Sequence, residues 1–131
     1  LRHWLAFLYF CRGSMLLYGG TEFAPRKQVG LFDADDNFGD RRCDMSDFLR
    51  RCKAMKQTLP LTGAVWYEVS GGAVIGRYKS PEGERLGVFG LADSGAEVPV
   101  DMPDGVYEDQ LGGKVTVTGG HVRLDGGPVV F

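Results

Sequence analysis

The densest group of metal-binding side chains is the run LFDADDNFGD, residues 31–40. Asp33, Asp35 and Asn37 stand at the first, third and fifth positions of a calcium-loop pattern. The sixth position, which requires glycine for a sharp turn, is Phe38, and the twelfth is Asp44 instead of a bidentate glutamate. We therefore expect no metal here, and interpret the run as a solvated acidic loop or the lining of a cleft for a neutral polar ligand.

Glu22 is a second carboxylate in a position that suggests chemistry. It follows the apolar run SMLLYGG, residues 14–20, which has the pattern of a fully buried parallel strand. Parallel barrels build their active sites just beyond the C-terminal ends of such strands. The alternative is a structural glutamate that accepts hydrogen bonds from neighbouring loop backbone.

The cysteines and histidines do not form a metal site in the sequence. Cys11, Cys43 and Cys52 include no CxxC pair, and His3 and His121 lie far from them along the chain. We expect reduced structural thiols, which favours a reducing, cytoplasmic compartment, and a surface imidazole at His121. The sequence also lacks a GxSxG elbow, a phosphate-binding glycine loop and a dinucleotide fingerprint, so we expect no cofactor.

Composition excludes other classes of protein. The chain has 131 residues and a net charge of −2, whereas a nucleic-acid-binding surface calls for a basic domain. Its longest apolar block, residues 4–11, is too short to span a membrane. Five glycines precede residue 61 and fifteen follow, which predicts two structural units, residues 1–60 and 61–131.

The first unit is predicted to contain a helix, a strand, a long loop and a second helix. The run HWLAFLYFC is apolar on nearly all sides, so its helix should be buried on most faces. A loop over about 21–42 follows the predicted strand. A second helix is predicted from Asp44, its expected cap, to Gln57, with an apolar stripe facing the core and a solvated basic face. The stripe consists of Met45, Phe48, Leu49, Cys52 and Met55.

The second unit is predicted to be entirely β. Eight short apolar or alternating runs are separated by turn signals, several of them Gly-Gly, and this pattern is typical of an antiparallel sandwich or barrel. Five aromatic residues could form a carbohydrate-binding surface or, alternatively, fill the core: Trp66, Tyr67, Tyr78, Phe89 and Tyr107.

Four segments in the same order resemble the end of α-amylase-family glycoside hydrolases (glycoside hydrolase family 13). The run FCRGSMLLYGGTEF resembles the eighth barrel strand of that family, and LFDADDNF resembles the loop after it. FLRRCKAMKQTLPL is similar to the last barrel helix, and GVYEDQLGGKVTVTGGHVRL is similar to the C-terminal sandwich.

The resemblance implies an α+β fragment: the last elements of a (β/α)8 barrel followed by an antiparallel β-sandwich. It implies a parent enzyme that cleaves α-glucosidic bonds of an α-glucan or oligosaccharide with retention, and Glu22, Phe23, Asp33 and Asp35 would border its substrate cleft. The three catalytic carboxylates of the family would precede Leu1, so the chain alone should be inactive. The alternatives are a non-catalytic amylase-like interaction domain and a carbohydrate-binding sandwich.

Overall fold

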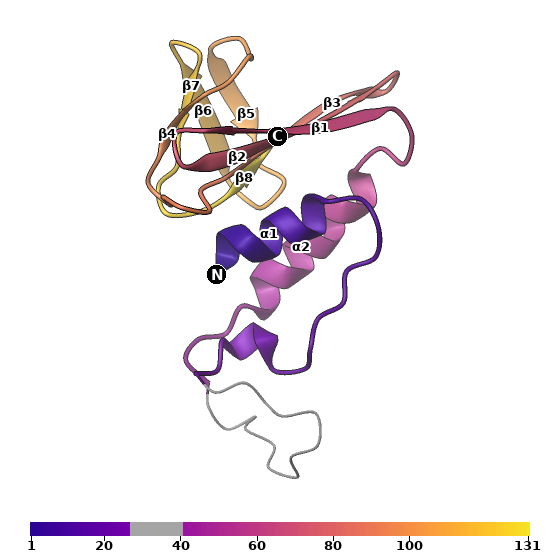
Figure 1. Cartoon of the computed structure of the whole chain (residues 1–131), viewed down its shortest axis with the longest axis vertical. Coiled ribbons are helices and arrows are strands. Elements are labelled where there is room, and N and C mark those ends of the chain that lie inside the picture. The colour runs from indigo at the N-terminus through magenta and orange to yellow at the C-terminus, as the bar shows by residue number, and fades with distance from the viewer. Residues whose placement is uncertain (27–40) are drawn as a thin grey trace.

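Two α-helices pack beneath two β-sheets in this computed structural model, which describes residues 1–26 and 41–131 (Figure 1). The helices are α1 (Arg2–Phe10) and α2 (Ser46–Thr58), and a short 3-10 helix, η1 (Thr21–Phe23), lies between them in the chain. The strands are β1 (Ala64–Ser70), β2 (Ala73–Ser80), β3 (Gly83–Phe89), β4 (Glu97–Pro99), β5 (Gly105–Glu108), β6 (Lys114–Thr118), β7 (His121–Arg123) and β8 (Val129–Val130).

The eight strands form two antiparallel four-stranded sheets. Sheet A has the order β1-β2-β3-β8, and sheet B has the order β4-β7-β6-β5. Each of the eight runs predicted as strands in the second unit contains one, although β4, β5, β7 and β8 are shorter than their runs. The Gly-Gly turns explain the short connections: Gly71 and Gly72 both have positive φ, as a two-residue hairpin turn of the favoured twist requires.

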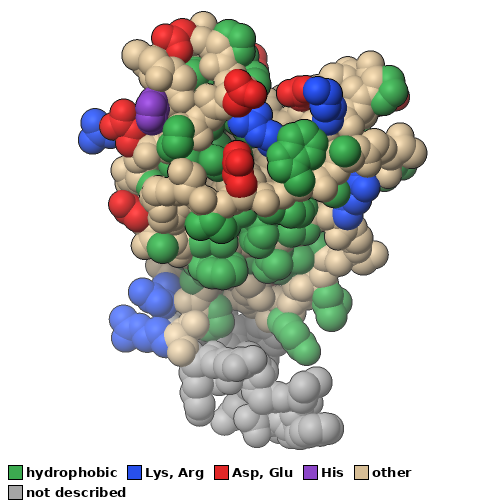
Figure 2. All heavy atoms as spheres, turned by 45° about the horizontal axis from the view of Figure 1, so that its top comes forward, with side chains coloured by type: hydrophobic (Ala, Val, Ile, Leu, Met, Phe, Trp, Pro, Cys, Tyr) green, Lys and Arg blue, Asp and Glu red, His purple; other side chains and the backbone are tan. Residues whose placement is uncertain are grey.

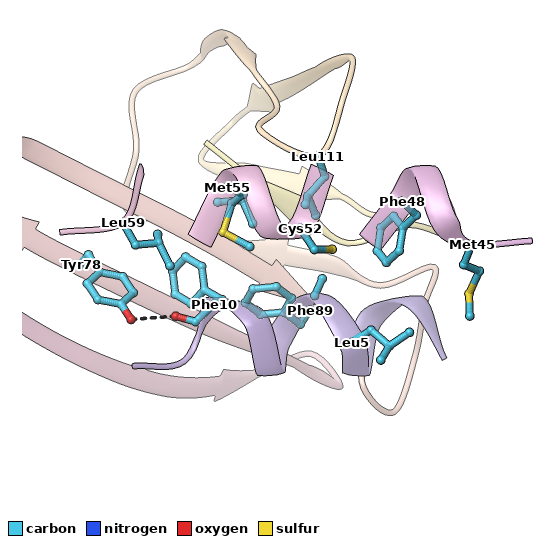
Figure 3. Packing of buried hydrophobic residues seen from close by; sticks show 12 residues of the cluster. Leu5, Phe10, Met45, Phe48, Cys52, Met55, Leu59, Tyr78, Phe89 and Leu111 are labelled. Atoms are coloured by element: carbon cyan, nitrogen blue, oxygen red, sulfur yellow. Dashed lines mark hydrogen bonds between the residues drawn. The ribbon is translucent and has the colours of Figure 1, made fainter. Parts of the chain in front are cut away.

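Two apolar cores stabilise the fold. One lies between the sheets and takes its side chains from both of them, including Ile75, Val88, Val98, Val117 and Val122. The other lies between the helices and sheet A (Figure 3). It combines Leu5 and Phe10 from α1 and Phe48, Cys52 and Met55 from α2 with Tyr78, Phe89 and Val130 from sheet A. The helices and the sandwich therefore share a core.

The predicted helix over Asp44–Gln57 is confirmed, with an offset at each end. Its apolar stripe faces the core: Met45, Phe48, Cys52 and Met55 are buried and Leu49 is partly buried. Three of its basic residues are solvated, as expected, and Lys56 is the exception.

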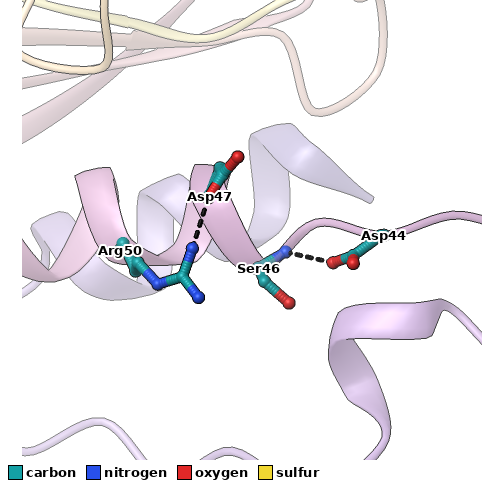
Figure 4. Close-up of polar contacts among 4 residues, drawn as sticks. All are labelled: Asp44, Ser46, Asp47 and Arg50. Atoms are coloured by element: carbon teal, nitrogen blue, oxygen red, sulfur yellow. Dashed lines mark hydrogen bonds and ion pairs between the residues drawn. The ribbon is translucent and has the colours of Figure 1, made fainter.

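The predicted capping at the start of α2 is only partly correct. Met45 occupies the cap position, and the Oδ1 atom of Asp44 accepts a hydrogen bond from the backbone N–H of Ser46 at 2.8 Å (Figure 4). Asp47 forms an ion pair with Arg50 one turn later. Hydrogen bonding from the side chain and the backbone of Ser46 holds the pKa of the Asp44 carboxyl below its usual value.

Two predictions for the first unit are wrong. Residues 14–18 form no strand, and the side chain of Leu16 is 82% exposed. A strand needs backbone partners on its edges, and no strand within the described residues pairs with this segment. The helix α1 is buried on one side only, because α2 and β3 pack against that side while Trp4 and Leu8 stay exposed.

Candidate functional site

Glu22 and Phe23 lie in η1, on the side of the helices away from the sheets (Figure 1). The Glu22 carbonyl accepts a hydrogen bond from the backbone N–H of Met45 at 2.8 Å. The Phe23 carbonyl accepts from the N–H groups of Arg42 at 3.0 Å and Cys43 at 3.4 Å. These bonds attach η1 to the residues that lead into α2, so the position of Glu22 is coupled to that of the helix.

The backbone on both sides of η1 adopts left-handed conformations. Gly20 has φ of 90°, which glycine adopts without steric cost, and Ala24 has φ of 48°, which is uncommon for a residue with a side chain. The Thr21 hydroxyl donates to the Tyr18 carbonyl at 2.7 Å and closes the turn that precedes η1. The segment is therefore a compact turn fixed by local bonds.

Phe23 is partly buried beneath a guanidinium group. The Arg41 side chain lies over the Phe23 ring, 4.2 Å from its centroid, a distance at which a cation is attracted to the ring face. Asp33 and Asp35, the other two predicted cleft residues, lie outside the described residues. Of the four predicted cleft residues, the structure describes Glu22 and Phe23, which are neighbours in sequence and lie on the single turn η1.

The end of α1 is a polar junction that the sequence did not reveal. The last carbonyls of a helix have no partner within it and need donors from elsewhere. Lys56 donates to the carbonyls of Tyr9 at 3.1 Å and Cys11 at 2.7 Å, and the hydroxyl of Tyr78 donates to the Phe10 carbonyl at 2.7 Å (Figure 3). Side chains from α2 and β2 thereby cap α1.

A recess in sheet A receives Phe10 beside this junction. Gly76 on β2 and Gly87 on β3 lie directly opposite each other. A Cβ atom at Gly76 would lie 2.5 Å from the Phe10 ring, and one at Gly87 would lie 3.0 Å from it. Phe10 also makes an edge contact with Tyr78 and a tilted contact with Phe89, with centroid distances of 5.0 and 5.3 Å. Because Gly76 and Gly87 have no side chains, sheet A leaves space for the Phe10 ring of α1.

His3 connects the other end of α1 to the sandwich. Its Nδ1 atom accepts a hydrogen bond at 3.0 Å from the backbone N–H of Gly90, which follows β3. Because Nδ1 accepts, the neutral ring carries its proton on Nε2. Burial disfavours the charged imidazolium and lowers the pKa of His3.

A large polar hollow of about 660 Å³ lies where the first turns of the helices meet sheet B. Its lining includes the charged side chains of Arg2, Arg51, Asp109, Lys114 and Arg123. The Oδ1 atom of Asp109 accepts backbone hydrogen bonds from Leu111 and Val130, so this carboxylate has a structural role, although burial raises its pKa.

The surface near the sheets carries both signs of charge. Figure 2 shows acidic and basic side chains interspersed on the β-rich end, with hydrophobic side chains gathered below them. His121 is exposed there, as predicted, with Nδ1 2.9 Å from the Gly119 carbonyl. Within residues 1–26 and 41–131, no three or more His, Cys, Asp or Glu residues are placed to hold a metal ion, and no described helix has the length and apolarity to cross a membrane.

The aromatic residues considered for carbohydrate binding separate into two groups. Tyr78 and Phe89 are buried in the core beneath the helices. Tyr107 is partly buried and packs against Phe131, whereas Trp66 and Tyr67 are about 40% exposed. Because Trp66 and Tyr67 are neighbours in a strand, they point to opposite faces of the sheet and do not form a common platform.

The cysteines are free thiols in different environments: Cys43 is exposed, Cys11 is partly buried and Cys52 is buried. Burial raises the pKa of Cys52 to about 12, which keeps its thiol protonated and unreactive.

Comparison with known proteins identifies the sandwich. Residues 67–131 match the family described as bacterial alpha amylase C-terminal domain. This part of the chain, which contains almost all of the eight strands, is therefore similar to that family. The resemblance to α-amylases seen in the sequence is confirmed.

The whole chain is also similar to part of a solved enzyme. The crystal structure of an alpha-amylase from Lactobacillus plantarum matches 99% of this chain with a TM-score of 0.87 and 28% sequence identity. The match covers 32% of that amylase, so the chain spans about a third of its length. No curated protein sequence matches the chain.

Proposed function

We propose that this chain is the C-terminal third of an α-amylase-type glycosidase that hydrolyses α-glucosidic bonds in starch-like glucans or oligosaccharides. Residues 1–60 would be the end of a (β/α)8 catalytic barrel, and residues 61–131 would be the sandwich that supports it. The observation that carries this proposal is the match to an alpha-amylase over 99% of the chain, because it includes the helices as well as the sandwich.

The exposed side chains of the first unit support the same proposal. Leu1, the cap residue of α1, and Trp4 and Leu8 on the helix lie about one turn apart and are all exposed. Leu16 and Tyr18 in the following segment are exposed as well. Exposed apolar groups that gather on one segment mark an interface. The remainder of a barrel would cover them, and it would supply strands to pair with residues 14–18.

In this proposal the two parts of the chain have different roles. Glu22 and Phe23 would border the substrate cleft, since they follow the segment that would become the last barrel strand. The acid, nucleophile and stabilising carboxylates would come from earlier strands of the barrel. A retaining glycosidase needs two of them about 5–5.5 Å apart on either side of the bond. The sandwich would hold the last barrel helices through the recess for Phe10 and the hydrogen bond from Tyr78 to the Phe10 carbonyl.

The reading frame upstream of Leu1 tests this proposal. We expect it to continue into a barrel sequence that carries two aspartates and a glutamate after separate strands. A continuous barrel without these carboxylates would indicate a non-catalytic amylase-like protein instead. An unrelated upstream sequence would contradict the proposal.

A further inference from the structure

The strand β1 is a long open edge of sheet A. It stands at the end of the order β1-β2-β3-β8, so β2 is the one described strand that pairs with it. The other edges in the described part of the chain are shorter: β8 has two residues, β4 has three and includes Pro99, and β5 has four. Proteins usually shorten their open edges or interrupt them with proline, lysine or a bulge, because an unpaired edge recruits another strand. β1 has seven residues with no proline or lysine, and its register with β2 is continuous.

The outward backbone groups of β1 belong to alternate residues. A two-glycine turn joins β1 to β2, and the pair that closes such a turn, here Ser70 and Ala73, is a hydrogen-bonded pair. Hydrogen-bonded and non-hydrogen-bonded pairs alternate along an antiparallel ladder. Val65, Tyr67 and Val69 therefore direct their N–H and C=O groups away from β2. The structure gives these groups no hydrogen-bond partner among the described residues.

The side chains of this strand are mainly apolar and exposed. Val69 is 79% exposed, Trp66 is 42% exposed and Tyr67 is 41% exposed. Glu68 is the one charged residue of β1, and its carboxylate lies 3.8 Å from the Nε atom of Arg77 on β2. A long, exposed and apolar edge strand is a surface for pairing with another strand.

The sequence of β1 is nearly symmetrical about its central residue. Read from either end, AVWYEVS runs through a small residue, a valine and a large residue to Tyr67. If a second copy runs antiparallel with Tyr67 on a twofold axis, Val65 lies opposite Val69 and Trp66 lies opposite Glu68. In this register the outward N–H and C=O groups of both edges bind one another, and no like charges lie directly opposite.

The two neighbouring registers are less favourable. A slip in one direction places Glu68 opposite Glu68 of the second copy, and like charges directly opposite destabilise a sheet. A slip in the other direction places Val69 opposite Gly63, which precedes the strand and whose carbonyl already accepts a hydrogen bond from Arg12. The symmetrical register is therefore the one that satisfies the whole edge.

We propose that β1 pairs with β1 of a second copy of this chain across a twofold axis, so that the two A sheets become one continuous sheet. This contact uses the same edge of both copies, and the far edge of sheet A is the two-residue strand β8, so assembly stops at the dimer. A contact made by one strand is small, and we expect a dissociation constant of about 10 µM. The dimer does not rest on the proposed function.

Sedimentation velocity of the 131-residue chain from about 1 to 200 µM tests the proposal, and we expect a monomer at the low end and a dimer at the high end. Val69→Pro removes an outward N–H without removing a donor from the β1–β2 ladder, and it should weaken dimerisation at least tenfold. Val69→Thr, which keeps the N–H and a β-branched side chain, should dimerise as the unmodified chain does. Trp4→Lys, which places a charge on the exposed side of α1, should also leave the dimer intact.

Amide exchange followed by NMR identifies the paired edge. At about 200 µM the amides of Val65 and Tyr67 should exchange at least tenfold more slowly in the unmodified chain than in Val69→Pro, and the same spectra report whether each variant is folded.

A chain that stays monomeric throughout, or a dimer that Val69→Pro leaves unchanged, would overturn the proposal. A dimer that Trp4→Lys dissociates, with the amides of Val65 and Tyr67 exchanging freely, would assign self-association to α1 and would also overturn it. None of these results bears on whether the parent protein is a glycosidase, which the upstream sequence decides.

Discussion

Removing the Tyr78 hydroxyl tests whether the helices and the sandwich form one cooperative structure. Tyr78→Phe keeps the ring and its edge contact with Phe10 and deletes only the donor to the Phe10 carbonyl. Tyr78 is fully buried, so water does not replace the lost donor. A buried acceptor left without its partner costs about 1–3 kcal/mol, and we expect Tyr78→Phe to lower the free energy of unfolding by about 2 kcal/mol.

Tyr107→Phe is the matched control. The Tyr107 hydroxyl donates to the Pro103 carbonyl at the same distance, 2.7 Å, but at an exposed position where water can take its place. We expect a loss below about 0.5 kcal/mol for this variant. Urea unfolding followed by circular dichroism measures both values. We expect the dependence of the unfolding free energy on urea concentration to be the same in both variants as in the unmodified chain. Equal small losses for the two variants would refute the role assigned to the junction at the end of α1.

Three other predictions concern the recess, the thiols and the buried histidine. Gly76→Ala should displace the ring of Phe10 and destabilise the chain by about 1–3 kcal/mol in the same urea assay, and an unchanged stability would show that the recess is not tightly filled. In the folded chain Cys43 should react with a thiol reagent within minutes, whereas Cys52 should react only after denaturant is added; rapid labelling of Cys52 would contradict its burial. Because the pKa of His3 is lower in the folded than in the unfolded state, its contribution to stability is present above about pH 6.5 and is lost as the pH falls toward the folded pKa. His3→Asn, which keeps an acceptor near Gly90, should flatten the decline in unfolding free energy between about pH 7 and 5, and an unaltered slope would exclude His3 as its source.

The strands of residues 61–131 were predictable because the sequence patterns that specify them are local. Gly-Gly pairs specify hairpin turns, and the alternation in KVTVT assigns Val115 and Val117 to the core, where both are buried. The helix α2 was predictable for the same reason, since its stripe repeats at helical spacing.

The parts that failed depend on neighbours that the sequence does not show. Residues 14–18 have the composition of a buried strand, but a strand requires backbone partners, and no strand within the described residues pairs with them. The recess for Phe10 arises from the strand register that places Gly76 opposite Gly87, which the sequence does not show. The role of Glu22 and Phe23 as cleft residues stays a prediction from the family resemblance, whereas their attachment to the start of α2 was visible only in the structure.

Hydrolysis by the polypeptide encoded in the frame that continues upstream of Leu1 tests the central claim most directly. That protein should be about three times as long as this chain, given that the chain matches 32% of an alpha-amylase. With maltoheptaose as substrate, ¹H NMR should detect first-formed products in the α-anomeric form, while the 131-residue chain alone should release none. Hydrolysis by the chain alone, or no hydrolysis of α-glucosidic substrates by the longer protein, would contradict the account.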